Sequence, residues 1–243
     1  MFTYTQHAVG GYSLGVRSTS ASDKPVVILV HGIGVSGDYY LPFAKELAKQ
    51  YRVLVLDLPG YGKTQKPKKP LTVYELGSVL AQYIREQELS APVLIGHSMG
   101  CQIVANCAQN YPEMCGKYIL LSPTVYDKER SLVWQAIRLL QDSLREPLKL
   151  NSVIVRDYLR MGMWRYLQTS RYMLADHIED TLPHCMQPGL IIRGEKDEIV
   201  PMNWVKKLAT LAPNVQPIEI PNAPHVVHYR MAREVADVCK IFI

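Results

Sequence analysis

The feature that most constrains the fold is a serine that lies between two glycines, where a short apolar run meets a helix-forming segment. Residues 92–95 (PVLI) are typical of a buried strand, and residues 99–109 have the composition and length of a helix. Ser98 falls between them, in the sequence G-H-S-M-G of residues 96–100. A side chain at either glycine of so tight a turn would collide with neighbouring backbone. The pattern predicts an exposed nucleophilic hydroxyl, the alternative being an ordinary glycine-containing loop.

Apolar runs of strand length alternate with helical patterns along most of the chain. The runs are residues 25–30, 52–56, 117–121, 189–193 and 215–220, and residues 4–17 with their Gly-Gly pair indicate an opening hairpin. Helical patterns occupy residues 39–50, 71–89, 203–211 and 229–242. Such alternation predicts an α/β fold built on a doubly wound, mostly parallel sheet.

The alternation stops between residues 124 and 188, where helix formers carry apolar residues at helical intervals. We expect one domain, with a core of residues 1–124 and 189–243 and a helical cap inserted at 125–188. A cap over a parallel sheet lies above the carboxyl ends of the strands, where such folds bind ligands. Three aromatic residues of the cap are therefore candidate pocket residues, although packing alone would also explain them: Trp134, Tyr158 and Trp164.

Composition narrows the possible partners. The net charge of +5 is mild, and the clustered lysines lie in one Pro-rich segment, so no nucleic-acid surface is expected. The five cysteines lack C-x-x-C spacing, and no secretory signal or membrane-length apolar run is present. We expect a cytoplasmic protein, monomeric or homodimeric, that acts on a small molecule. Arginines interspersed through the cap argue against a stable membrane association.

A serine hydroxyl needs a general base, and the base needs an acid to orient it. Two residues follow Ser98 in the required order, each in the loop after a predicted strand: Asp197 in GEKDEIVP and His225 in PNAPH. Asp127, after the preceding strand, is the alternative acid. His228 forms an H-x-x-H pair with His225, but no Glu or Cys stands at metal spacing, so no metal site is expected.

Two backbone amides are candidates for stabilising an oxyanion. One is the N–H of Met99, which follows the nucleophile. The other is the N–H of Ile33 in H-G-I-G, residues 31–34, where glycines leave room for a substrate oxygen.

Taken together, these motifs resemble the α/β-hydrolase superfamily, and within it the small capped bacterial serine hydrolases. The resemblance rests on H-G-I-G, D-L-P-G-Y-G at residues 57–62, G-H-S-M-G, G-E-K-D-E-I-V-P and P-H in this order. It implies an eight-stranded, mostly parallel sheet with a helical lid, and no cofactor. Cys101 and Pro224 stand where many relatives carry glycine.

The resemblance implies a carboxylic ester hydrolase that uses a Ser98–His225–Asp197 triad. We expect a small or medium, largely apolar ester or thioester as substrate, cleaved through an acyl-enzyme. Two alternatives remain open at this point. The same triad could hydrolyse the carbon–carbon bond of meta-ring-fission products, or the chain could be a ligand receptor with slow turnover.

Overall fold

A computed structural model describes residues 1–20, 23–143 and 146–243, with the side chains of 142 and 143 left aside. Its centre is an eight-stranded sheet in the order β1-β2-β4-β3-β5-β6-β7-β8. The strands are β1 (Thr3–Val9), β2 (Tyr12–Ser18), β3 (Val26–Val30), β4 (Arg52–Asp57), β5 (Val93–His97), β6 (Lys117–Leu121), β7 (Gly189–Gly194) and β8 (Val215–Ile220). β1 and β2 form an antiparallel hairpin, and β2 pairs antiparallel with β4. The remaining pairs, along β4-β3-β5-β6-β7-β8, are parallel. The predicted mostly parallel sheet and its opening hairpin are confirmed.

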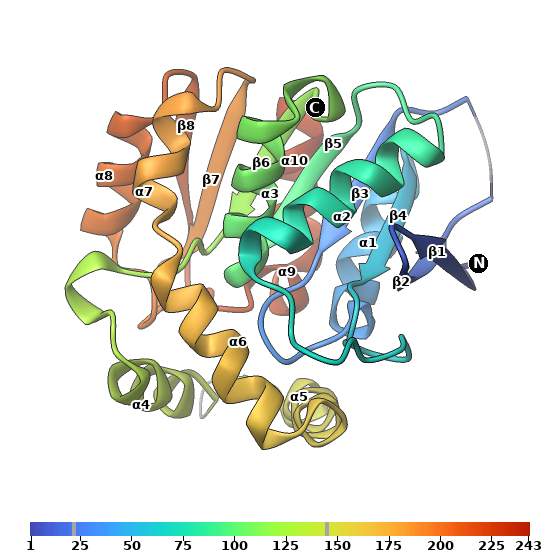
Figure 1. Ribbon diagram of the computed structural model, residues 1–243. Helices are drawn as coiled ribbons and strands as arrows, with labels where there is room; N and C mark the ends of the chain where they lie inside the picture. The colour runs from blue at the N-terminus through green and yellow to red at the C-terminus, as the bar shows by residue number, and fades with distance from the viewer. Residues whose placement is uncertain (21–22, 144–145) are drawn as a thin grey trace.

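Helices cover both faces of this sheet (Figure 1). One face packs against α2 (Val73–Glu86), α3 (Met99–Asn110) and α8 (Met202–Leu211), and the other against α1 (Leu41–Leu47) and α10 (Ala232–Phe242). Successive strand residues alternate between the two cores: Ile28 and Val30 join the first, Val27 and Leu29 the second. Strands that are apolar throughout are therefore needed, because both of their faces are buried.

The structure differs from the sequence prediction at the C-terminal end. The single helix expected over residues 229–242 is two helices, α9 (Val227–Arg230) and α10, because Met231 between them has non-helical φ and ψ angles of −111° and 44°. β8 can include Pro217, which has no backbone N–H, because it is an edge strand with a neighbouring strand on one side only.

Between β6 and β7 the chain forms a helical insert made of α4 (Leu132–Ser143), α5 (Leu148–Met161), α6 (Met163–Ala175) and α7 (Ile178–Thr181). In Figure 1, α4, α5 and α6 lie at one end of the sheet, and the C-terminus lies at the other. Among the described residues, no helix is long and apolar enough to cross a bilayer. All five cysteines are free and buried.

Candidate active site

Ser98 lies in a strained turn between β5 and α3. Its φ and ψ are 54° and −121°, in a region that non-glycine residues rarely adopt. A Cβ on Gly96 would come within 2.3 Å of the Gly100 carbonyl oxygen, and one on Gly100 within 2.3 Å of the Val30 oxygen. Both glycines are thus required by close backbone approach, and the turn points the residue between them away from the sheet.

His225 and Asp197 are brought together from the loops after β8 and β7. The Nδ1 of His225 lies 3.1 Å from Oδ1 and 3.0 Å from Oδ2 of Asp197. Because a carboxylate can only accept, Nδ1 carries the proton and Nε2 is left as the basic nitrogen. Asp197 also accepts from the backbone N–H groups of Ile199 and Val200, at 2.9 and 3.0 Å. These two backbone hydrogen bonds fix the position of the carboxylate independently of the imidazole.

The charge state of Asp197 follows from these contacts. Burial alone would raise the pKa of this carboxyl, but His225 and the hydrogen bonds from the loop outweigh it and hold the pKa below its ordinary value. Asp197 remains ionised beside the imidazole, as a group that must stabilise an imidazolium does. Asp127, the alternative acid, instead pairs with Lys207 at 2.6 Å.

The loop after β3 lies against the serine turn. A Cβ on Gly32 would lie 3.2 Å from the Cβ of Ser98, and Ile33 lines the same cavity as Ser98. Gly34 has a φ of +76°, and a Cβ there would come within 2.4 Å of the Tyr158 ring of α5. This loop is thus confined between the Ser98 turn and the helical insert.

A hydrogen-bond chain that the sequence did not predict links three of the site's loops. The Gly32 N–H donates to the Tyr39 hydroxyl at 3.0 Å, and that hydroxyl lies 3.0 Å from Nδ1 of His97. Nε2 of His97 lies 3.1 Å from the backbone carbonyl of His225, so Nε2 donates and Nδ1 accepts from Tyr39. Burial lowers the pKa of His97 well below its usual range, which keeps the ring neutral. Tyr39 carries no motif that would have identified it.

His228, the second histidine of the H-x-x-H pair, is completely buried. Its ring stacks on Tyr40 with centroids 4.3 Å apart and meets the edges of Tyr39 and His97 at 4.7 and 4.6 Å. Burial lowers its pKa well below the usual value. His228 therefore packs as a neutral aromatic ring behind the site. The described residues contain no cluster of three or more potential metal ligands.

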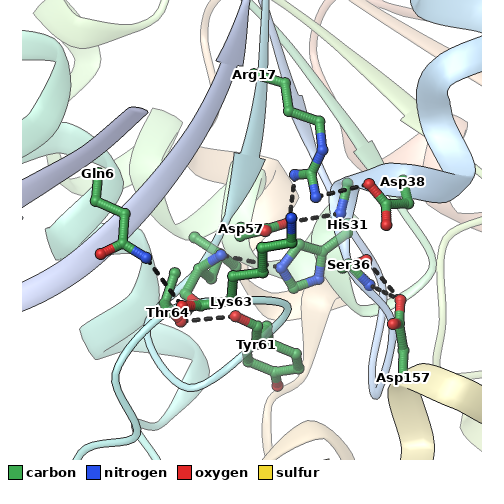
Figure 2. A network of polar contacts seen from close by, with 12 residues as sticks. Gln6, Arg17, His31, Ser36, Asp38, Asp57, Tyr61, Lys63, Thr64 and Asp157 are labelled. Carbon is green, nitrogen blue, oxygen red and sulfur yellow. Dashed lines mark hydrogen bonds and ion pairs between the residues drawn. The ribbon is translucent and has the colours of Figure 1, made fainter. Parts of the chain in front are cut away.

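A carboxylate from the insert also holds the loop after β3. Asp157 of α5 accepts from the backbone N–H and the hydroxyl of Ser36, at 2.9 and 2.5 Å. Figure 2 shows this contact beside a row of ion pairs, in which Arg17 contacts Asp57 at 2.8 Å and Asp38 at 2.7 Å. Arg156 continues the row, with Asp38 at 2.7 Å and Asp157 at 2.9 Å. The insert is therefore tied to the core next to the candidate oxyanion loop.

Ser98 and His225 open into a cavity of about 750 Å³ between the core and the insert. Its lining from α4, α5 and α6 is mainly apolar and aromatic, including Leu139, Ile154, Tyr158, Met163 and Tyr166. Glu146, just before α5, also lines it and accepts from the Val226 N–H at 3.0 Å. The volume suits a small or medium organic molecule.

Of the three predicted cap aromatics, only Tyr158 lines this cavity among the residues described. Trp134 and Trp164 lie on the outward faces of α4 and α6, with exposed fractions of 47% and 58%. Helical spacing indicated apolar residues along these two helices, but it could not show that several of them lie on the side turned to solvent.

A family model described as "Alpha/beta hydrolase family" matches residues 27–238, which include the Ser98 turn, Asp197 and His225. The chain belongs to the alpha/beta hydrolase family. This assignment covers both the core and the helical insert.

Several proteins are similar to this family member over most of their length. Pimeloyl-[acyl-carrier protein] methyl ester esterase of Xanthomonas axonopodis is 22% identical, over 90% of this chain and 95% of the esterase. 2-(Acetamidomethylene)succinate hydrolase of Mesorhizobium japonicum is 23% identical, over 90% and 87%. The crystal structure of the enol-lactonase from Burkholderia xenovorans LB400 has a TM-score of 0.84 at 20% identity, over 98% and 99%. At these identities the solved structure shows a shared fold.

Proposed function

We propose that this family member is a serine hydrolase that cleaves a small or medium, largely apolar carboxylic ester or thioester. The observation that carries the proposal is the His225–Asp197 pair, buried beside a strained serine turn in one mainly apolar cavity. A neutral imidazole oriented by an ionised carboxylate is what a weak hydroxyl nucleophile requires. The esterase and lactonase named above act on esters, which supports this reaction class.

In the proposed mechanism, Nε2 of His225 takes the proton of the Ser98 hydroxyl as the oxygen attacks the acyl carbon. Asp197 stabilises the resulting imidazolium, and the backbone N–H groups of Ile33 and Met99 donate to the oxyanion. The imidazolium then gives its proton to the leaving alcohol or thiol, which leaves Ser98 acylated. Water attacks the acyl-enzyme, with His225 accepting its proton, and His225 returns a proton to the Ser98 oxygen as the acyl bond breaks and the acid product departs.

The oxyanion assignment has a structural basis at both donors. Met99 is the first residue of α3, and the first N–H groups of a helix have no partner within it. Their direction also places the positive end of the helix dipole at the site. Ile33 lies on the loop confined by Ser98 and Tyr158, and this confinement would hold its amide in place before charge develops.

The test is replacement of Ser98 by Ala, followed with p-nitrophenyl butyrate. We expect kcat to fall on the order of 10⁴-fold or more, because the three residues act as a unit. A fluorophosphonate should label the parent and not Ser98→Ala. Turnover by Ser98→Ala at the parental rate would refute the proposal. A labelled parent that turns over no compound in a substrate panel would favour the receptor alternative.

The bond cleaved can be identified with that panel, which should contain apolar esters, coenzyme A thioesters and ring-fission products. The name of the similar 2-(acetamidomethylene)succinate hydrolase does not specify an ester, which supports testing compounds other than esters. The mainly apolar lining favours acyl groups without charge, so we expect the highest kcat/KM for apolar esters. A higher kcat/KM for a ring-fission product would assign the chain to carbon–carbon hydrolysis instead.

A further inference from the structure

The outer surface of the insert is unusually apolar. Ten large apolar side chains of α4, α5 and α6 are exposed: Val133, Trp134, Ile137, Leu140, Leu148, Val155, Leu159, Met163, Trp164 and Leu167. Leu148 is 87% exposed, Leu159 78% and Met163 72%. We call these ten residues the cap face. Because α6 contacts both α4 and α5, these side chains lie on adjoining helices, and exposed apolar surface of this kind marks an interaction site.

The cap face extends to the entrance of the cavity. Four of its members, Leu140 of α4, Val155 and Leu159 of α5 and Met163 of α6, line the cavity and are also largely exposed. The opening therefore lies within the apolar surface, and the three helices meet around it. A partner that covers the cap face also controls what enters the cavity.

Exposed basic residues border this surface. Lys149 and Arg160 lie next to Leu148 and Leu159 in α5, and Arg171 follows Leu167 by one turn of α6. The β4–α2 loop adds Lys66, Lys68 and Lys69, all exposed. This loop lies against the end of α5, because Nζ of Lys66 donates to the Arg160 carbonyl at 2.5 Å. Apolar residues with a basic border match an anionic lipid surface.

The interspersed arginines, which argued from sequence against a membrane role, do not interrupt the cap face. Arg165 is buried, with its guanidinium donating to the Pro67 carbonyl. Arg138 is paired with Glu129 at 2.6 Å, and Arg156 with Asp38 at 2.7 Å. These three side chains turn toward protein groups and leave the apolar residues outermost.

We propose that the cap face docks reversibly on an anionic lipid surface, with the cavity entrance turned toward the acyl chains. An apolar ester dissolved in the lipid could then enter without crossing water. A second copy of this chain seated on the same face would close the entrance, so we commit to a lipid surface. Delivery of substrate from the lipid rests on the proposed hydrolysis, whereas docking does not.

Docking can be measured without turnover by flotation of the Ser98→Ala protein with vesicles. We expect binding to phosphatidylcholine mixed with phosphatidylglycerol, and at least tenfold weaker binding to phosphatidylcholine alone or at high salt. The double variant Leu148→Glu/Trp164→Glu should lose binding; neither residue is among the cavity lining. Ile241→Glu is the matched control, because Ile241 is 89% exposed in the last turn of α10, and it should bind normally. The C-terminus, which directly follows α10, lies at the end of the sheet opposite the insert (Figure 1).

With Ser98 restored, the double variant should hydrolyse soluble p-nitrophenyl butyrate at the parental rate and a vesicle-embedded ester at least tenfold more slowly. Failure of the Ser98→Ala protein to bind any vesicle would overturn docking and leave the hydrolase proposal standing. Unchanged binding by Leu148→Glu/Trp164→Glu would also overturn it. So would a dimer in sedimentation that these substitutions dissociate.

Discussion

The loops at the strand ends and the helical insert are stabilised in different ways. Around Ser98 the backbone is confined by backbone, as the close approaches at Gly96 and Gly100 show. The described residues of the insert add no strand to the central sheet, and next to the site the insert meets the core through the Asp157–Ser36 hydrogen bonds and through side-chain packing, including that of the buried Leu150. Its outer face remains apolar and exposed. Under the proposed function, the core sets the chemistry of this site, whereas the insert sets which molecules reach it.

Three buried or partly buried aspartates allow this comparison to be tested. Asp197 lies wholly within the core, Asp157 joins the insert to the core, and Asp176 lies where the insert returns to α3. If the division of roles is correct, their removal should affect chemistry, loop position and stability respectively.

The largest effect is expected at Asp197. Asp197→Asn should lower kcat by about 10³- to 10⁴-fold, because an amide no longer selects the His225 tautomer and does not stabilise an imidazolium. Steady-state hydrolysis of p-nitrophenyl butyrate measures this loss. Asp127→Asn is the control, since Asp127 pairs with Lys207 instead, and it should retain parental kcat. A loss of kcat in Asp127→Asn with parental kcat in Asp197→Asn would show that the acid has been assigned to the wrong strand.

An intermediate effect is expected at Asp157. Asp157→Ala removes both hydrogen bonds to Ser36, three residues beyond the candidate oxyanion donor Ile33. We expect kcat to fall about 10- to 100-fold with little change in KM, because small misplacements of a donor weaken transition-state binding above all. Affinity for a boronic acid, which mimics the tetrahedral intermediate, should fall in parallel.

Two further variants separate positioning from general stability. Asp157→Asn keeps an oxygen that can accept from the Ser36 N–H, so it should recover part of the lost kcat. Arg160→Ala removes only the long 3.6 Å ion pair on the other side of Asp157, whose arginine is 44% exposed, and should leave kcat unchanged. If KM rises while kcat is preserved in Asp157→Ala, the carboxylate shapes the pocket and does not position the loop.

The same division decides what the sequence could predict. Strands of the parallel sheet must be apolar throughout, and the serine turn needs its two glycines. Local sequence patterns were therefore enough to predict the core fold and to place Ser98, Asp197 and His225 at strand ends. Tyr39, Asp157 and Glu146 were not, because their roles arise from contacts between distant segments: Tyr39 OH to His97, Asp157 to Ser36 and Glu146 to Val226. Trp134 was misleading because helical spacing does not say which side of an inserted helix faces solvent.

The smallest effect is expected at Asp176, where it concerns stability and not catalysis. Burial raises the pKa of this carboxyl to about 6, although Asn106 donates to it at 3.0 Å. The folded state therefore binds a proton more tightly than the unfolded chain, where an aspartate has a pKa near 3.9. The stabilisation this gives is complete below pH ~4 and disappears as the pH rises to about 6.

Asp176→Asn abolishes this titration and can still accept from Asn106, so it should be more stable than the parent by about 1–2 kcal/mol at pH ~7 and by little below pH ~4. Urea unfolding across this pH range measures the difference. Asp180→Asn is the control, since its side chain is 77% exposed in the neighbouring α7, and it should change the free energy of unfolding at pH ~7 by less than about 0.5 kcal/mol. Because Asp176 lies far along the chain from the Asp157 contact, kcat should be unchanged in Asp176→Asn. A gain in the free energy of unfolding that is constant with pH would mean that the amide of Asp176→Asn forms new contacts. A loss of kcat would mean that the segment through which the insert returns to α3 also positions the site.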